Sequence, residues 1–314
     1  MATLPLVVAL NPSVDAEWSV PQIQFEEKNE IQSERRWAGG KGINVARWLR
    51  HLGTSGRLLL PLGGPTGREI AACLASERLD AEVVAIHSNS RVNVIVTPPR
   101  GHQMRFNAIP PRLSGPEWRA LAGRVKELLP KSSMLVLSGS LPLGVPPDAY
   151  ARLIRLANAA DVPTLLDCEG PALVSGAGAA PLLIKPNHAE LEAWCGFPLA
   201  TEERVIEAAR LLRACTGGWV MASGGHRGAW LVGPGEREIW SARPERTRPR
   251  NTVGAGDAMV AAAVRSITRG EPPAAWVAAA VSAGTASTCV DAGALPSAAL
   301  LKKVRRGVRL TYVG

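Results

Sequence analysis

Long uninterrupted hydrophobic runs are missing from this sequence. Hydrophobic residues make up 46% of its 314 residues, but Arg, Asp, Gly or Pro interrupts every apolar stretch before the ~18 residues that a membrane-spanning helix needs. Residues 1–10 are apolar but have no basic flank and no small-residue cleavage site, so we expect a first strand there, not a signal peptide. With 20% charged residues, the composition is that of a soluble globular protein and excludes disordered and fibrous classes.

Closely spaced cysteines are also missing. The five cysteines stand at positions 73, 168, 195, 215 and 289, and no two lie within four residues of each other. This spacing excludes a zinc knuckle and a redox pair, and the odd number argues against a disulfide framework. We therefore expect a protein of the reducing cytoplasm.

Acidic residues are in the minority. The sequence has 36 Lys and Arg against 27 Asp and Glu, a formal net charge of +9. The basic residues are densest at 243–250 and 302–309, and neither cluster is interleaved with the aromatic residues of a base-stacking surface. A basic enzyme that handles anionic metabolites explains this charge better than a nucleic-acid-binding protein, so we expect no nucleic-acid partner.

Short apolar runs alternate with amphipathic stretches along the chain. We expect buried strands at 4–10, 58–62, 134–137, 164–166, 182–184 and 219–221. We expect helices at 42–52, 67–77, 115–129, 148–160, 189–195 and 201–214. Strands and helices in alternation predict an α/β fold, a mostly parallel central sheet with helices on both faces, formed by residues 1–314 as one domain.

Two further stretches read as extended but are not followed by helices. Residues 14–25 and 91–106 are polar on one side, and alternation is clearest from Arg91 to Val96. We expect them to form a small β-sheet, a lid beside a binding cleft, built approximately from residues 12–36 and 88–108. The apolar face of such a lid is a natural contact for a homodimer.

A glycine-rich turn at residues 251–260, Asn-Thr-Val-Gly-Ala-Gly-Asp-Ala-Met-Val, leads into a helix. Free backbone N–H groups converge at such a helix N-terminus and the helix dipole favours negative charge, so the turn predicts an anion site. Asp257 opens the helix. Its carboxylate could accept a proton from an attacking hydroxyl, or it could only cap the helix, and spacing alone does not separate the two.

A second glycine cluster, Gly-Gly-Lys-Gly-Ile-Asn-Val-Ala-Arg at residues 39–47, also leads into a helix. The glycines permit close approach, while Lys41 and Asn44 offer donors. Neither cluster is a Walker loop, because no G-x-x-x-x-G-K-[ST] occurs. Neither is a dinucleotide fingerprint, because Val45 and Met259 stand where the third Gly or Ala belongs.

Polar residues follow several of the expected strands. They occur at 11–15, 138–142 and 185–190, and Asp167, Ser223 and Gly225 likewise close strands. The carboxyl ends of parallel strands meet at one edge of a sheet, which is where open α/β sheets bind ligands. We therefore expect these groups to share one cleft.

Together these segments resemble the ribokinase-like (PfkB) carbohydrate kinases. Residues 39–47 and 251–260 are similar to the two signatures of that family, and 11–15, 138–142, 185–190 and 279–286 are similar to its other landmarks in order. The wording of both signatures is most similar to the hexose-phosphate branch, which includes 1-phosphofructokinase, tagatose-6-phosphate kinase and the minor 6-phosphofructokinase.

The resemblance implies ATP-dependent phosphorylation of a ketohexose phosphate, foremost fructose 1-phosphate to fructose 1,6-bisphosphate, with Mg²⁺. Asp257 would be the catalytic base, and the N–H groups of Gly254, Ala255 and Gly256 would stabilise the moving phosphoryl group. The implied substrate site comprises Asp15, Gly39, Gly40, Lys41, Asn44, Arg91 and Ser138. The implied ATP site comprises Lys185, Asn187, Ser223, Gly225, Gly228, Thr252, Gly254, Gly256, Ala280 and Gly284. Asn187 and Glu190 would hold Mg²⁺ through water.

Other readings remain open at this point. Tagatose 6-phosphate, fructose 6-phosphate, an unphosphorylated sugar or a nucleoside could be the acceptor, and a non-catalytic sensor of nucleotides or sugar phosphates could share the scaffold. Asn251 stands where ribokinases proper carry an Asp that helps to hold a monovalent cation, so a dependence on K⁺ is not implied.

Overall fold

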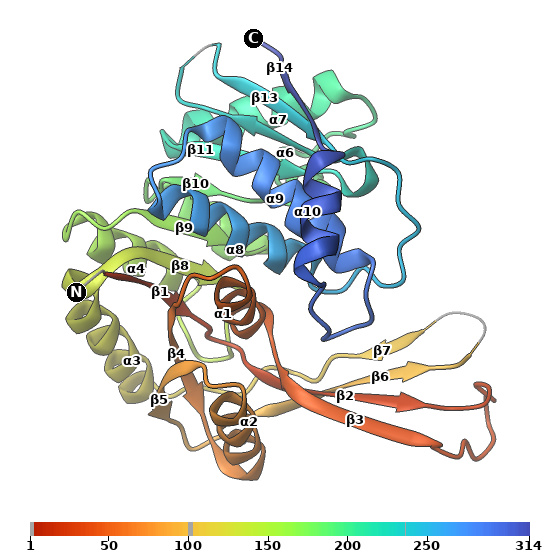
Figure 1. Cartoon of the computed structure of the whole chain (residues 1–314). Coiled ribbons are helices and arrows are strands. Elements are labelled where there is room, and N and C mark those ends of the chain that lie inside the picture. The colour runs from red at the N-terminus through yellow and green to blue at the C-terminus, as the bar shows by residue number, and fades with distance from the viewer. Residues whose placement is uncertain (1–2, 100–102, 236) are drawn as a thin grey trace.

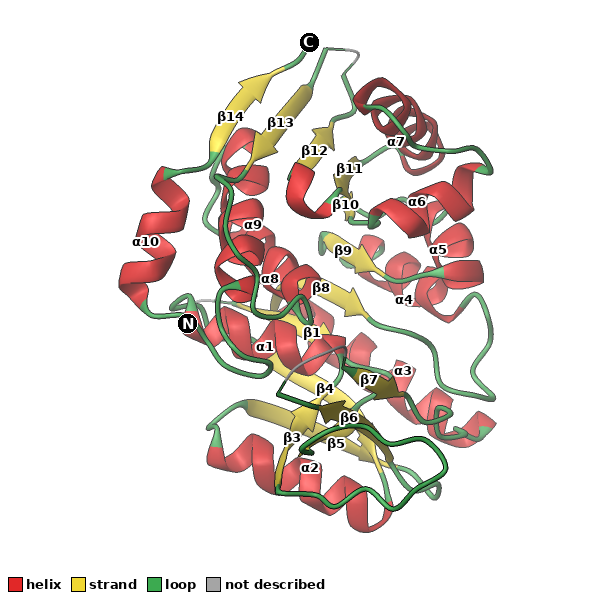
Figure 2. Ribbon diagram, turned by 90° about the vertical axis from the view of Figure 1, so that its right-hand side faces the viewer, coloured by secondary structure: helices red, strands yellow, loops and turns green. Residues whose placement is uncertain are grey.

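The computed structural model describes residues 3–99, 103–235 and 237–314. The main body is a sheet of ten strands in the order β14-β13-β12-β11-β10-β9-β8-β1-β4-β5, with helices packed on both of its faces (Figures 1 and 2). Pairing is parallel from β11 to β5, and the β11-β12-β13-β14 end is antiparallel. The expected α/β fold with a mostly parallel sheet is confirmed.

All six expected buried strands are present. They are β1 (Leu4–Val8), β4 (Arg57–Leu62), β8 (Ser132–Ser138), β9 (Thr164–Asp167), β10 (Leu183–Ile184) and β11 (Trp219–Ser223). The remaining strands of the large sheet were not expected: β5 (Asp80–Ala85), β12 (Ala229–Val232), β13 (Ile239–Arg243) and β14 (Arg309–Tyr312). Two of them, β5 and β14, are edge strands with much of their surface exposed, so they lack the continuous apolar run of a central strand.

The six expected helices are also present, with shifted ends. They are α1 (Lys41–His51), α2 (Gly64–Ser76), α3 (Gly115–Leu128), α4 (Ala149–Asn158), α6 (His188–Cys195) and α7 (Glu202–Thr216). The glycine turn leads into α8 (Ala255–Thr268), which is followed by α9 (Pro273–Thr288). Two helices were not expected, α5 (Gly170–Ala177) and α10 (Ala298–Arg306), and both are short. Single turns of 3-10 helix, η1 (Leu129–Lys131) and η2 (Gly225–Arg227), complete the list.

Two hydrophobic cores lie on the two faces of the large sheet. Side chains of α1, α2, α8 and α9 pack on one face, and those of α3 to α7 pack on the other. The most extensively packed helix pair is α8 with α9, and α8 also packs on α1. This arrangement fixes the N-terminus of α8 beside the N-terminus of α1, and both glycine clusters therefore lie at one edge of the sheet. Within the described residues, no helix is long and apolar enough to cross a membrane.

A small sheet of four strands stands away from the body, at the lower right of Figure 1. Its order is β3-β2-β6-β7, from β2 (Ser13–Ser19), β3 (Ser33–Gly39), β6 (Arg91–Thr97) and β7 (Met104–Phe106). The extended stretch expected at 14–25 ends at Ser19. The expected lid range 12–36 reaches into β3, but a separate strand there was not expected, because most residues of β3 are exposed and do not alternate. Residues 100–102 of the expected lid lie outside the described residues.

Gly42 sits where α1 crosses β1. A Cβ built on Gly42 would lie 2.5 Å from Ala9 Cβ and 2.9 Å from Ala9 Cα. The close packing of this helix on the strand therefore requires the missing side chain, which explains one glycine of the 39–47 cluster by packing rather than by ligand contact.

Gly42→Ala should destabilise the fold by about 1–3 kcal/mol, because a methyl group there is overpacked against a backbone atom. Gly123→Ala is the matched control: Gly123 lies inside α3 with nothing within 4 Å of the added Cβ. That change should stabilise the protein by about 0.5–1 kcal/mol through helix propensity. Urea unfolding of both variants measures the difference, and equal effects would contradict the packing role of Gly42.

Candidate active site

The glycine turn and α8 form one wall of the site. Gly254 is the N-cap of α8 and adopts a left-handed conformation with φ 78°, and Ala255 and Gly256 begin the helix. The N–H groups of the first helical turn have no partner within the helix, and the helix dipole adds positive potential at this end. Gly254, Ala255 and Gly256 are each half-buried, so a ligand can reach these backbone groups. The geometry leaves these backbone groups available to an anion, and the anion site itself stays a prediction.

Asp257 lies behind this turn and is almost fully buried, with 6% of its surface exposed. The Asn44 side chain, from α1, donates a hydrogen bond from Nδ2 to Asp257 Oδ2 at 2.8 Å. The pKa of Asp257 is raised to about 6: burial and then the nearby charge of Asp167 raise it, and they outweigh the Asn44 hydrogen bond and the cations of Lys41 and Lys185, which lower it. The carboxyl group is therefore mostly ionised at neutral pH and has an affinity for protons well above that of an exposed aspartate.

Asp167, at the end of β9, is the carboxylate around which two lysine amines gather near the glycine turn. Its carboxylate lies 2.9 Å from Lys185 Nζ and 3.7 Å from Lys41 Nζ, and it accepts a hydrogen bond of 3.0 Å from the Ser138 hydroxyl. Burial alone would raise the pKa of Asp167, but the two lysines outweigh it and hold the pKa below its ordinary value. Asp167 is thus a buried carboxylate that fixes two cations.

Lys185 faces the glycine turn, and Lys41 belongs to the same charge cluster through Asp167. Lys185 Nζ lies 3.6 Å from where a Cβ on Gly256 would stand, so the amine is directed at the glycine turn. Lys41 is the first residue of α1, and its Nζ is also 3.7 Å from Glu190 Oε1. Burial lowers the pKa of Lys41, but Asp167 and Glu190 outweigh that effect and keep the pKa above its ordinary value. Two fixed positive charges therefore flank the helix N-terminus.

Sequence reasoning noted that Asp167 closes a strand but assigned it no role. Its importance depends on Lys41, Lys185 and Ser138, which are distant in the sequence. Ser138 must also be reassigned: it is 2% exposed and its hydroxyl is committed to Asp167, so it supports that carboxylate instead of contacting a substrate.

Asp15, on β2, is the polar centre of the small sheet's inner end. Its Oδ1 accepts hydrogen bonds from Ser13 Oγ at 2.8 Å and from Asn93 Nδ2 at 2.9 Å. A Cβ on Gly39 would lie 2.1 Å from Asp15 Oδ2, so the carboxylate occupies the space that a side chain would fill. Asn93 was missed, although the alternation of β6 places it on the same face as Arg91.

Arg91 begins β6 beside the same cluster. Its Nη1 donates to the Ala108 carbonyl at 3.2 Å and its Nη2 to the Asn11 carbonyl at 3.4 Å, while Nε is buried without a partner among the described residues. Burial lowers the pKa of Arg91 and the charge of Asp15 opposes that effect. The guanidinium remains charged and is held by weak backbone contacts that leave it able to bind an anion.

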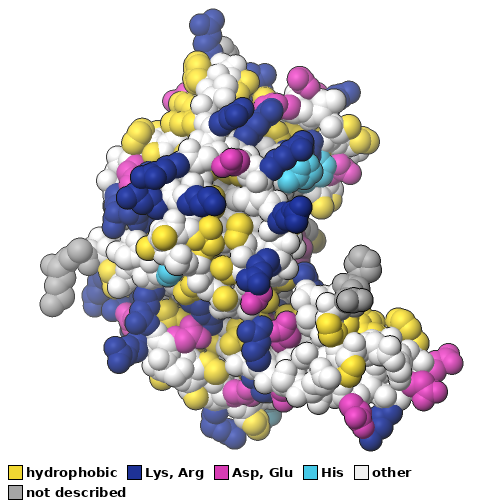
Figure 3. Space-filling view, turned by 45° about the vertical axis from the view of Figure 1, so that its right-hand side comes forward, with side chains coloured by type: hydrophobic (Ala, Val, Ile, Leu, Met, Phe, Trp, Pro, Cys, Tyr) yellow, Lys and Arg dark blue, Asp and Glu magenta, His cyan; other side chains and the backbone are white. Residues whose placement is uncertain are grey.

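A cavity of about 40 Å³ connects the small sheet to the glycine turn. Asp15, Asn44 and Gly254 all line it. Gly40, the N-cap of α1 with φ 103°, lies at the adjoining end of the helix, where a Cβ would be 3.2 Å from the Asn11 carbonyl oxygen. In Figure 3 the small sheet projects as an arm, with a hollow between the arm and the body. Two predicted substrate residues, Asp15 and Asn44, therefore border one space with Gly254 of the glycine turn, and Asp257 is joined to that space through its hydrogen bond with Asn44.

Asn187 and Glu190 form a capping box at the N-terminus of α6. Asn187 Oδ1 accepts from the Glu190 N–H at 2.9 Å, and Glu190 Oε2 accepts from the Asn187 N–H at 2.8 Å. The other carboxylate oxygen of Glu190 is directed to Lys41. No group of three or more His, Cys, Asp or Glu side chains suited to a metal ion occurs in the described ranges.

The other predicted ATP residues lie in two places: at the end of β11 with the turn η2, and just ahead of the glycine turn. Ser223 ends β11 beside Asn187, Gly225 (φ 60°) begins the turn η2 and Gly228 (φ 89°) follows it. Thr252 is exposed ahead of the glycine turn. A Cβ on Gly225 would meet nothing within 4 Å, which leaves the turn open to a ligand. A Cβ on Gly228 would lie 2.0 Å from the Ala242 carbonyl oxygen, so this glycine is required by the turn itself.

The structure does not support the predicted place of Ala280 and Gly284 in the ATP site. Ala280 has no exposed surface, and Gly284 is buried with its missing Cβ 2.7 Å from Met259 Cγ. Both residues lie in the interface of α9 with α8, so their small size serves helix packing and not contact with adenine. The apolar pattern at 279–286 is the same for a packed helix and for a helix beside adenine, so the sequence could not distinguish them.

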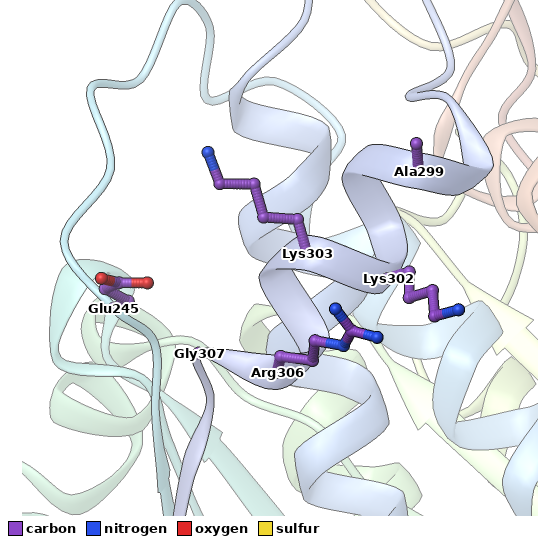
Figure 4. Close-up of a pocket in the computed structure, with 6 residues that line it drawn as sticks. All are labelled: Glu245, Ala299, Lys302, Lys303, Arg306 and Gly307. Atoms are coloured by element: carbon purple, nitrogen blue, oxygen red, sulfur yellow. The ribbon is translucent and has the colours of Figure 1, made fainter.

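A second hollow, of about 400 Å³, lies beside α10. Lys302, Lys303 and Arg306 line it from the helix and Glu245 lies on the opposite side, with Lys303 extending toward the side of Glu245 (Figure 4). Its basic side chains all come from the 302–309 cluster, the 243–250 segment contributes only Glu245, and no predicted site residue is among those that line it.

Asp257→Asn should stabilise the protein at pH 7.5, by about 2–3 kcal/mol. The pKa of Asp257 is raised to about 6 by folding, so the wild type loses stability as pH rises through roughly 4 to 6, whereas Asn carries no such penalty. Urea unfolding at pH 7.5 and pH 5 measures this, and the variant's advantage should shrink at pH 5. An equal difference at both pH values would contradict the burial cost of the carboxylate.

Comparisons with known proteins show which proteins this chain is similar to. The chain is 37% identical over 265 residues to a 1-phosphofructokinase of Rhodobacter capsulatus, covering 84% of this chain and 83% of that protein. It is 32% identical over 284 residues to the ATP-dependent 6-phosphofructokinase isozyme 2 of Escherichia coli, covering 90% and 91%. The crystal structure of phosphofructokinase-2 from Escherichia coli in complex with potassium is similar with a TM-score of 0.91 and 31% identity, covering 98% of this chain and 99% of that one.

Residues 6–298 match the model of the pfkB family carbohydrate kinases. The match includes both glycine clusters, Asp15, Asp167 and Asp257, which the fold brings to one edge of the sheet. The chain belongs to the pfkB family of carbohydrate kinases.

Proposed function

We propose that this protein is an ATP-dependent kinase of a ketohexose phosphate, with fructose 1-phosphate as its acceptor and fructose 1,6-bisphosphate as its product. The observation that carries this proposal is the buried carboxylate of Asp257 beside a helix N-terminus flanked by Lys41 and Lys185. Relatives named 1-phosphofructokinase, at 31–37% identity, support the choice of acceptor.

In the proposed mechanism Asp257 accepts the proton of the attacking sugar hydroxyl. Its Oδ2 is held by Asn44, and burial keeps its proton affinity high enough to receive a proton at neutral pH. Transfer of the phosphoryl group develops negative charge on its oxygens, and the N–H groups at Gly254, Ala255 and Gly256 are oriented to stabilise it. Lys185, fixed by Asp167, adds a positive charge at the same turn.

The substrate would lie between the small sheet and the glycine turn. Asp15 and Asn44 line the connecting cavity and are suited to hold sugar hydroxyls. Gly39 and Gly40 permit the close approach, and Arg91 is placed to bind the phosphate of the sugar, because a planar guanidinium matches phosphate oxygens. Lys41 would bind a phosphate of one of the two substrates.

The ATP phosphates would lie along Lys185, Asn187, Ser223, Gly225, Gly228 and Thr252. A Mg²⁺ ion fits this donor set, because Mg²⁺ keeps most of its waters and needs only one or two carboxylates in addition to phosphates. Glu190, with one oxygen outside the capping box, would hold it through water together with Asn187. When bound, the ion would neutralise charge on the phosphates.

We further propose that the small sheet acts as a lid and as the contact of a homodimer in the cytoplasm. Phe25 and Phe106, at 76% and 52% exposure, place apolar surface on or near this sheet. The described cysteines are all unpaired, which suits a reducing compartment. Sedimentation equilibrium distinguishes a dimer from a monomer.

The function is tested by ADP release with Mg-ATP against fructose 1-phosphate, fructose 6-phosphate, tagatose 6-phosphate, fructose, ribose and adenosine. Fructose 1-phosphate should have the highest kcat/KM, and Asp257→Asn should lower kcat by about 10²–10⁴, because the general base is lost. Turnover of only a neutral sugar or nucleoside would overturn the proposed acceptor. Near-normal turnover by a folded Asp257→Asn variant would overturn the role of that carboxylate.

Arg91→Met should raise the KM for the phosphorylated acceptor by about 10–100-fold, because a charge-assisted contact with phosphate is lost. The KM for ATP should change little. Arg105→Met is the matched control, since Arg105 lies exposed on β7 of the same sheet. Steady-state kinetics with both substrates varied measure the effect. A similar rise in both variants would show loss of general positive charge and contradict a specific contact.

A further inference from the structure

Arg47 makes more polar contacts than any role assigned so far explains. It lies one turn after Asn44 on α1, and its side chain is only 10% exposed. Its Nη1 donates to Asn44 Oδ1 at 2.9 Å, and its Nε and Nη2 donate to the two carboxylate oxygens of Glu77 at 2.6 and 2.7 Å. Nη2 also donates to the Ala38 carbonyl at 2.8 Å. Such a set of contacts holds the guanidinium in one orientation.

The contact with Asn44 determines which end of the Asn44 carboxamide faces the catalytic carboxylate. A carboxamide has one acceptor end and one donor end, and a rotation of 180° exchanges them. Arg47 can only donate, so it holds the amide oxygen on its own side. The amide nitrogen is thereby directed to Asp257 Oδ2, where the 2.8 Å hydrogen bond is found.

We propose that Arg47 is a positioning residue for phosphoryl transfer: it fixes the Asn44 carboxamide so that its N–H, and not its oxygen, faces the Asp257 carboxylate. The inference rests on the proposed role of Asp257 as the base. Once Asp257 has accepted the substrate proton, its carboxyl group can itself donate, and it then no longer selects the amide orientation. Arg47 retains the selection at that stage, so the Asn44 N–H is still in place for the carboxylate once Asp257 has released the proton to water.

The same guanidinium also connects three separate elements to this hydrogen bond. Glu77 is the C-cap of α2, and Ala38 lies on β3 of the small sheet, next to Gly39. The Asn44 orientation is therefore anchored at α2 and at the base of the small sheet. Other charged groups also act on Asp257: Lys41 from α1, Asp167 from β9 and Lys185 after β10. These are unchanged by substitution of Arg47, so they do not confound its effect.

The test is a double-mutant cycle with Arg47→Met and Asn44→Ala. If Arg47 acts through Asn44, each single change lowers kcat by about tenfold, and the double variant is no worse than Asn44→Ala alone. Arg50→Met is the matched control, because Arg50 is an exposed residue of the same helix, and its kcat should be unchanged. Additive effects, or a normal kcat in folded Arg47→Met, would overturn the proposal.

A second readout does not depend on turnover. In protein labelled with ¹³C at the aspartate carboxyl carbon, the Asp257 signal is assigned by its absence from Asp257→Asn and titrated by NMR. Its midpoint should move to higher pH in both Asn44→Ala and Arg47→Met, and should stay in place in Arg50→Met. Asn44→Ala removes the hydrogen bond that favours the carboxylate, and Arg47→Met lets the amide turn its oxygen toward the protonated acid, which favours the protonated form.

A merely structural role for Arg47 would lower the unfolding temperature without moving this midpoint at 25 °C, and an unmoved midpoint would overturn the proposal. If Arg47→Met does not fold, Arg47→Lys replaces it in both the kinetic cycle and the NMR titration, because it keeps the charge but lacks the planar fork that contacts Asn44 and Glu77 together. If no acceptor of the panel is turned over, the proposed function fails while the NMR titration still decides the positioning role.

Discussion

The buried carboxylate of Asp167 is the interaction on which the site depends. Two lysine amines beside a helix N-terminus repel each other and the positive end of the helix dipole, and burial penalises both. Asp167 offsets this cost through its contacts with Lys185 and Lys41, and the Ser138 hydroxyl satisfies one of its oxygens. Replacing only one member of such a buried group leaves an uncompensated charge, so each replacement is expected to destabilise the whole cluster.

The environment of Asp257, on α8, shifts its pKa in the opposite direction to that of Asp167. It lacks a direct ion pair among the described contacts and is held by the neutral amide of Asn44, so burial prevails and raises its pKa to about 6. Asp167 contributes to that rise through its own negative charge. One fold thus keeps two buried aspartates at different proton affinities, one firmly ionised to fix cations and one able to receive a proton.

The small residues around the site have two different uses. Gly39 leaves space for the Asp15 carboxylate and Gly225 leaves a turn open, whereas Gly42, Gly228 and Gly284 permit close packing of backbone or side chains. In a sequence these glycines look alike. The positions of neighbouring atoms decide which of them can face a ligand, and this explains why Gly284, together with Ala280, was assigned to adenine in error.

The α/β fold, the central strands and the two glycine clusters could be predicted from the sequence, because burial on both faces and helix amphipathicity are local patterns. That Asp257 opens a helix behind a glycine turn could be predicted as well. The contacts that join Asp167 to Lys41 and Lys185, hold Asp15 through Asn93 and Ser13, and orient Asn44 through Arg47 could not be predicted in this way. Each of these depends on side chains from strands and helices far apart in the chain, whose meeting is set by the packing of the sheet. Exposed edge strands such as β3 and β14 were not predicted for a related reason. Their extended conformation depends on pairing with β2 and β13 more than on a pattern in their own residues.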